Sequence, residues 1–276
     1  METMNLKIYP KSSFMKSIVD HYQIVKIKEP TTLKTLPNGR LDSWINFTGS
    51  FYYFDEGSGR FIQAPQNGFF PLSNKSMLIK IVEEIVCLNI KFFPHVLLYG
   101  DMSRLVTSKQ LVSFSQVFDT DIKESVYEIL PQKENINLIV AEIEDYFSLR
   151  LCGGNKEKIL LQYILQRIEI DEINSVSVKW LAKKFNLTEK TLQRTFVNQV
   201  GLTPKLFAKI VRFQKAIRNI RSNKNVTSGI RLNMALANGY YDQSHFGKDS
   251  KKIAGLTPKL LFKNLHPGFP DLIVLE

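Results

Sequence analysis

Cysteine is scarce in this chain, and long apolar runs are missing. The 276 residues include two cysteines, Cys87 and Cys152, which lie far apart in the sequence. This usage predicts neither a disulfide framework nor a zinc site, and it is typical of a reducing compartment. No stretch of about 18 apolar residues occurs, so a membrane-spanning helix is not expected. The first ten residues lack the apolar core of a secretion signal, and we expect a cytoplasmic location.

Recognisable catalytic patterns are missing as well. The N-terminal half offers only His21 and His95, too few for a metal site built from converging His and carboxylate ligands. The sequence has no Ser/His/Asp set, no glycine-rich phosphate loop and no methyl-accepting cysteine motif. We therefore expect neither an enzyme nor a metal or other cofactor.

Positive charge is concentrated in one part of the chain. The formal net charge is +11, but residues 175–276 hold 18 Lys and Arg against 5 Asp and Glu. Residues 1–174 have a net charge of −2. Such asymmetry is typical of a neutral half joined to a half that binds nucleic acid or an anionic membrane. A merely solvated basic domain is the alternative.

The segment of residues 1–120 is expected to be β-rich. Gly and Pro punctuate it, and the intervening runs are rich in β-branched and aromatic residues: Ser43–Phe47, Ser50–Phe54 and Val86–Phe92. Several short strands at this spacing predict a sandwich or barrel. The aromatic residues of the second run are expected in the sheet core, with a ligand pocket as the alternative.

Residues 121–173 are predicted to form a helical hairpin and linker. One apolar stripe runs through Asn135–Leu151, and another, which includes Ile159 and Ile164, runs through Lys156–Ile170. The break at Cys152–Asn155 separates the two helices. The stripes either pack on their own domain or form a dimer interface.

An internal repeat lies in the basic segment of residues 174–266, which a tail of residues 267–276 follows. Gly201–Leu206 recurs as Gly255–Leu260, 54 residues later. Before each copy lies a unit that reads as helix, tight turn, helix. Asn186 and Gly239 tolerate the left-handed backbone that such turns need. Thr188 and Asp242 are natural N-caps for the second helices.

The second helix of each repeat has an apolar inner face and a polar outer face. Leu192 and Phe196 form the inner face in the first repeat, and Phe246 forms it in the second. Such a short helix fits a DNA major groove, where Arg or Lys donates to guanine and Gln bridges adenine. Lys205–Arg221 reads as one helix of roughly 26 Å that joins the two repeats. One chain could then read two successive major grooves.

These residues resemble the AraC/XylS family of bacterial transcriptional regulators over about Val176–Lys263. The matching residues are Leu181-Ala182, Leu187-Thr188, Leu192–Phe196, Gly201–Pro204, Arg212, Ala216, Gly239–Phe246 and Gly255–Pro258. The resemblance implies a seven-helix domain that binds promoter DNA in the nucleoid. By position it implies base reading by Lys190, Gln193, Arg194, Gln243, Ser244, His245 and Lys248. Phosphate contacts are assigned to Thr188, Lys183, Lys184, Lys209, Lys251 and Lys252, with simple solvation as the alternative for the lysines.

The N-terminal part resembles the cupin-like domain that precedes this module in some family members, especially those of the Bacteroidetes. Pro37–Gly39, Gly68 and Lys91–Pro94 fit that pattern. The resemblance implies sensing of a small-molecule effector or homodimer formation. Contact with RNA polymerase, the sign of regulation and the oligomeric state stay open, and no membrane partner is expected.

The second repeat departs from the family pattern at two positions. Ser250 stands where Phe is expected, which forgoes on the order of 2 kcal/mol of burial, and Gly247 inside the helix costs about 1 kcal/mol relative to Ala. We therefore predict a loosely packed second recognition helix, with most specificity in the first. Trp180 is expected in the core. The alternative function is a protein-interaction module with non-specific DNA binding.

Overall fold

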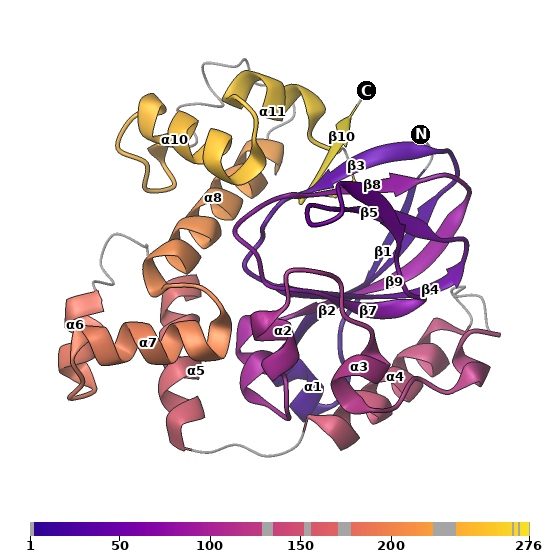
Figure 1. Cartoon of the computed structure of the whole chain (residues 1–276), viewed down its shortest axis with the longest axis horizontal. Helices are drawn as coiled ribbons and strands as arrows, with labels where there is room; N and C mark the ends of the chain where they lie inside the picture. Colours follow the sequence, from indigo (N-terminus) through magenta and orange to yellow (C-terminus); the bar gives the residue numbers. More distant parts are fainter. Residues whose placement is uncertain are drawn as a thin grey trace. The chain divides into compact units, whose positions relative to one another are not determined.

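The computed structural model describes residues 3–128, 135–151, 156–170, 178–222, 236–266, 268–269 and 271–275. The chain splits into two compact units (Figure 1). The N-terminal unit comprises Met1–Thr32, Arg40–Leu72 and Ile79–Lys158, and the C-terminal unit comprises Leu33–Gly39, Ser73–Leu78 and Ile159–Glu276. Cys152 and the predicted first helix of the second repeat, up to Ala235, lie outside the described residues. None of the described helices is long and apolar enough to cross a membrane.

The first sheet confirms the β-rich prediction. It has the antiparallel order β1-β2-β9-β4-β7. Its strands are β1 (Thr3–Ile8), β2 (Val19–Ile27), β9 (Ile85–Phe92), β4 (Leu41–Thr48) and β7 (Asn67–Phe70). The short helix α1 (Ser13–Ile18) lies between β1 and β2, and the oxygen of Ser12 caps it by accepting from Met15 N. Because side chains alternate along a strand, each sheet face carries its own set of residues.

One face of this sheet packs on helices. Phe69 and Phe92 contact Phe147 of α4 (Ile136–Arg150), and Phe69 also contacts Phe114 of α3 (Phe114–Phe118). All four rings are fully buried. The other helical segments of the N-terminal unit are α2 (Ser103–Thr107) and the 3₁₀ turns η1 (Pro94–Leu98) and η2 (Glu124–Val126).

The second sheet has the order β10-β3-β8-β5-β6. The strands are β10 (Leu272–Leu275), β3 (Thr31–Thr35), β8 (Met77–Ile81), β5 (Phe51–Asp55) and β6 (Arg60–Gln63). In β5, Phe51 and Tyr53 are buried, as predicted, whereas Tyr52 and Phe54 are only half-buried. Strand β10 comes from the segment expected to be a plain tail. It lies in the C-terminal unit, where Leu36 N donates to Asp271 O at 2.7 Å.

The two helices of the predicted hairpin exist, but they belong largely to different units. The stripe of α4 is buried as predicted. In α5 (Lys156–Ile170) the prediction was wrong about Ile159, whose side chain is 69% exposed. Ile164 is buried as predicted, together with Leu161, Leu165 and Ile168. In α5 the predicted stripe and the observed stripe both consist of apolar residues at helical spacing. Only tertiary packing therefore decides which of the two is buried.

The C-terminal unit is mostly helical. Its helices are α5, α6 (Val178–Lys184), α7 (Glu189–Val200), α8 (Pro204–Ser222), α10 (Gln243–Asp249), the π-helical turn η3 (Ser250–Ala254) and α11 (Pro258–Asn264). One apolar cluster joins α8, α10, η3 and α11 through residues such as Phe213, Phe246 and Phe262. Leu36, from the N-terminal part of the sequence, belongs to the same cluster and is 3% exposed.

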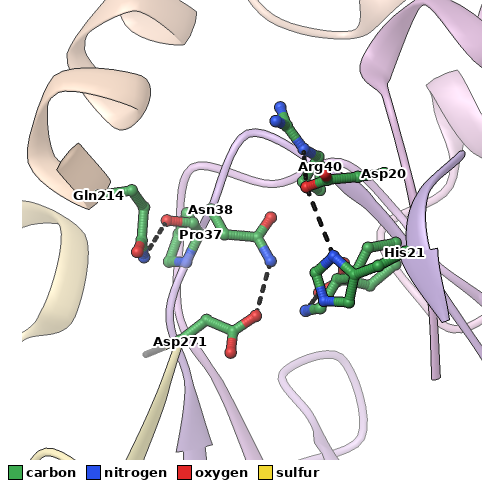
Figure 2. Close-up of polar contacts among 9 residues, drawn as sticks. Asp20, His21, Pro37, Asn38, Arg40, Gln214 and Asp271 are labelled. Carbon is green, nitrogen blue, oxygen red and sulfur yellow. Dashed lines mark hydrogen bonds and ion pairs between the residues drawn. The ribbon is translucent and has the colours of Figure 1, made fainter. Parts of the chain in front are cut away.

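Figure 2 shows polar contacts from each of the two units. In the C-terminal unit, Gln214 Nε2 donates to Pro37 O at 2.9 Å, and Asn38 Nδ2 donates to Asp271 Oδ2 at 2.9 Å. Both bonds are buried, so they tie the Leu33–Gly39 segment to α8 and to the start of β10. In the N-terminal unit, Arg40 Nε lies 3.3 Å from Asp20 Oδ2, and His21 Nδ1 lies 3.6 Å from the same oxygen.

Candidate DNA-binding interface

The first helix-turn-helix motif consists of α6 and α7, and it has the predicted left-handed turn, N-cap and buried inner face. Asn186 in the turn has a positive φ of 53°. Thr188 caps α7, because its Oγ1 accepts from Thr191 N at 3.0 Å. Leu192 and Phe196 are fully buried, so the opposite side of α7 faces solvent.

The exposed side of α7 carries the three predicted base readers. Lys190, Gln193 and Arg194 are all exposed. Val197 is 38% exposed and lies one helical turn after Gln193 and Arg194. Sequence reasoning missed Val197 because an apolar residue on a helix is normally assigned to the core. On a groove-facing side, an apolar group can contact a thymine methyl group.

The second motif has the same local devices as the first. Gly239 has a φ of 81°, and Asp242 caps α10 by accepting from His245 N at 2.6 Å. Phe246 is fully buried, and its ring stacks on Phe213 and Phe262.

Ser250 stands where a loss of packing relative to Phe was predicted, and that energetic prediction stays a prediction. Ser250 is fully buried, and its hydroxyl donates to Leu256 O at 2.7 Å. The backbone widens into the π-helical turn η3, and Ile253 and Ala254 are buried in the cluster that contains Phe246. The wider turn thus seats apolar groups in the inner face without a large side chain at residue 250.

The predicted base readers of α10 divide into two groups. Gln243, Ser244 and Lys248 are exposed. His245 is half-buried, its ring packs edge-on against Tyr240, and its Nε2 lies 3.4 Å from Arg212 Nη2. Tyr241, next to the cap residue, is 91% exposed and was not predicted as a contact.

The predicted phosphate-binding lysines also differ among themselves. Lys183, Lys251 and Lys252 are exposed. Lys184 contacts the Tyr163 hydroxyl, and its ammonium lies 5.1 Å from the centre of the Trp180 ring. The core prediction for Trp180 was wrong, since this side chain is 43% exposed. Lys209 Nζ lies 2.5 Å from the buried carboxylate of Asp249.

The candidate reactive groups of the N-terminal unit are the half-buried Cys87 and the buried His95. Burial raises the pKa of Cys87 to about 12, so its thiol stays protonated at neutral pH. Burial lowers the pKa of His95, whose Nε2 lies 2.7 Å from Ser17 O. Among the described residues, no three His, Cys, Asp or Glu side chains come together as a metal site.

Comparison with known proteins agrees with this geometry. A helix-turn-helix domain model matches residues 181–264. The chain is 26% identical over 137 residues to the HTH-type transcriptional regulator MtrA of Neisseria gonorrhoeae. That match covers 49% of this chain and 44% of MtrA, so it spans less than half of this relative.

Solved structures extend the similarity to the fold of most of the chain. ToxT from Vibrio cholerae, in its P21 crystal form, has a TM-score of 0.55 at 10% identity. The alignment covers 87% of this chain and 97% of that one. Wild-type ToxT bound to an unsaturated fatty acid has a TM-score of 0.52 at 10% identity, over 86% and 92% of the two chains.

Fold and site together define a chain in which a β-rich part with two sheets precedes a helix-turn-helix domain. The motif residues that resemble the AraC/XylS family lie within the segment that the helix-turn-helix domain model matches, apart from the residues before 181.

Proposed function

We propose that the protein is a bacterial transcription regulator that places α7 and α10 in two successive major grooves of promoter DNA. The observation that carries the proposal is that α7 and α10 are built alike and lie in one basic unit. Each helix has an N-cap, a buried apolar inner face and an exposed polar outer face. Base edges supply sequence information, while lysines near the helices add phosphate contacts.

The length of α8 supports two grooves for one chain. This helix has 19 residues, which corresponds to about 28 Å at 1.5 Å per residue. Successive major grooves on one side of a duplex are about 34 Å apart. A single helix of this length can therefore connect two reading helices without a flexible linker.

Selection from random duplex DNA at near-physiological salt tests the proposal. We expect enrichment of a motif with two blocks about one helical turn apart. Enrichment of one block would show that only one helix reads bases. Salt-sensitive binding without enrichment would favour non-specific binding by an interaction module.

We also propose that the N-terminal unit senses a small polar effector. Trp44 of β4 packs edge-on against Phe51 of β5, so this face of the first sheet points toward the second. Gln23 and Asn89 are cross-strand partners on that face, as are Asn89 and Trp44, and Asn46 and Cys87. The buried oxygens Asn46 Oδ1 and Asn89 Oδ1 have no hydrogen-bond partner among the described residues.

Such oxygens favour a ligand that donates hydrogen bonds, unlike the apolar chain of the fatty acid found in ToxT. Thermal-shift assays with hydroxyl- or amine-bearing small molecules, and with fatty acids for comparison, test this. We expect stabilisation by a member of the polar set that Asn46→Leu abolishes. Stabilisation by fatty acids alone would contradict the proposal.

A further inference from the structure

One buried carboxylate joins the linker helix α8 to the second recognition helix α10. The Asp249 side chain is 1% exposed, and Lys209 Nζ lies 2.5 Å from its Oδ1. Arg212 Nη2 and the Tyr240 hydroxyl both donate to its Oδ2 at 3.3 Å. Lys209 and Arg212 are three residues apart on α8, and Tyr240 lies in the turn before α10. The carboxylate therefore binds three segments at once.

Asp249 and Phe246 are the two anchors of α10. They are three residues apart, so they share the buried face of the helix. Ser244 and Lys248, which are four residues apart, lie on the opposite, exposed side. With an apolar anchor and an ionic anchor on one face, the helix cannot rotate about its axis without breaking one of them.

Arg212 extends the constraint to the first turn of α10. Its guanidinium carbon lies 4.7 Å from the centre of the Tyr240 ring, and its Nη2 lies 3.4 Å from His245 Nε2. Buried ion pairs add little net stability, because desolvation offsets the Coulomb attraction, and their best-attested use is to specify geometry. The cluster is therefore better explained by orientation than by stability.

We propose that Asp249 is a positioning residue for DNA recognition, which holds α10 through Lys209 and Arg212 in the orientation that presents Ser244 and Lys248 to the second groove. This inference rests on the proposed two-groove function. It also assigns Lys209 to Asp249 rather than to a DNA phosphate.

Asp249→Asn tests the inference, because it removes the charge and keeps the shape. Glu142→Gln is the matched control, since it changes net charge equally at an exposed residue of α4 that pairs with Lys123. Binding is measured to the selected duplex and to duplexes with the first or the second block scrambled.

In Asp249→Asn, discrimination at the second block should fall at least about 10-fold, the scale of one base contact. Discrimination at the first block should stay within about 2-fold, while binding to random DNA should not weaken. Glu142→Gln should change none of these values.

Circular dichroism and cooperative unfolding establish whether Asp249→Asn is folded. If it is not, Lys209→Met decides, because this side chain is 27% exposed and its loss leaves Arg212 in place. If Lys209 positions α10, discrimination at the second block should fall about 3-fold in Lys209→Met and discrimination at the first block should not change. If Lys209 instead contacts a phosphate, the variant should bind all duplexes more weakly by the same factor, and the slope of log affinity against log salt concentration should fall by about 1.

The possible failures are distinguishable. If the wild-type protein ignores the second block, the two-groove function is overturned, and this inference falls with it. If the wild type discriminates and the folded variant discriminates equally, only the positioning role of Asp249 is overturned.

Discussion

Single side chains on α7 and η3 should separate base reading from phosphate binding. Arg194→Ala should weaken binding to the selected duplex by about 1–3 kcal/mol and relax the preference at one position of the first block. Lys252→Ala should weaken binding to all duplexes equally. It should also reduce the slope of log affinity against log salt concentration by about 1. Titrations of both variants at several salt concentrations measure these effects. An equal loss on every duplex for Arg194→Ala would show that Arg194 binds only phosphate.

The buried His266 predicts that stability falls in mild acid. Burial, aided by the nearby charge of Arg221, lowers its pKa to about 4, although Asp271 acts in the opposite direction. In the unfolded chain the pKa of histidine is about 6.5. The folded state therefore favours neutral His266, and this contribution is fully present above pH of about 6.5 and lost as the pH falls toward 4. His95, whose pKa burial also lowers, adds to the effect in the N-terminal unit.

Replacing the ring tests this pH dependence. Glutamine is chosen because its amide oxygen can still accept from Gly268 N, as the ring Nδ1 of His266 does. In His266→Gln, the decrease in the free energy of unfolding between pH 6.5 and 4 should be smaller by on the order of 2 kcal/mol. Urea unfolding at several pH values measures it, and His95→Gln reports the N-terminal share separately. An unchanged slope in His266→Gln would show that another group titrates.

Residue-level prediction from sequence succeeded where the cause is local. The caps at Thr188 and Asp242 and the left-handed turns at Asn186 and Gly239 depend on chemistry within a few residues, and all four were predicted. The exposure of Trp180 and the pairing of Lys209 with Asp249 depend on contacts between helices. No local pattern encodes those contacts.

At the scale of elements, the glycine inside α10 is predicted to be replaceable. A Cβ at Gly247 would lie 4.0 Å from Pro258 Cγ, an ordinary contact. Gly247→Ala should therefore raise the free energy of unfolding by about 1 kcal/mol through its higher helix propensity. Gly255→Ala, the contrasting control, should lower it, because this glycine has a φ of 70°. Chemical denaturation of both variants checks the pair, and destabilisation by Gly247→Ala would contradict the prediction.

Long periodic elements were predictable, whereas small changes in register were not. The helices α4 and α5 lie where the apolar periodicity placed them, and the strands β4, β5 and β9 lie where Gly/Pro punctuation and β-branched and aromatic residues placed them. The π-helical turn η3 adds one residue to a helical turn, and that choice depends on how Ile253 and Ala254 pack. The residue type at position 250 therefore could not reveal that Ile253 and Ala254 would be buried through a wider turn.

At the scale of the whole molecule, the order of the sequence does not match the division into compact units. Leu33–Gly39 precedes the helix-turn-helix segment by more than a hundred residues and yet belongs to the C-terminal unit. Leu36 is buried in the cluster with Phe213 and Phe246, and Asn38 bonds Asp271. Periodicity could not reveal this, because a leucine directly after a short strand gives no sign of the unit in which it will be buried.

The C-terminal unit should therefore be incomplete when residues 159–276 are expressed alone. This fragment loses the Leu36 side chain, whose burial corresponds to about 2–5 kcal/mol by analogy with Leu→Ala substitutions in cores. It also loses the partners of Gln214 and Asp271. We expect a lower unfolding temperature than for the same unit in the full chain. A synthetic peptide of residues 31–41 should restore stability in a concentration-dependent way, since a ligand that binds only the folded state stabilises it. The same peptide with Leu36→Asp is the control and should have no effect. A fragment that unfolds at the temperature of the full chain and ignores both peptides would show that the domain is complete without the N-terminal segment.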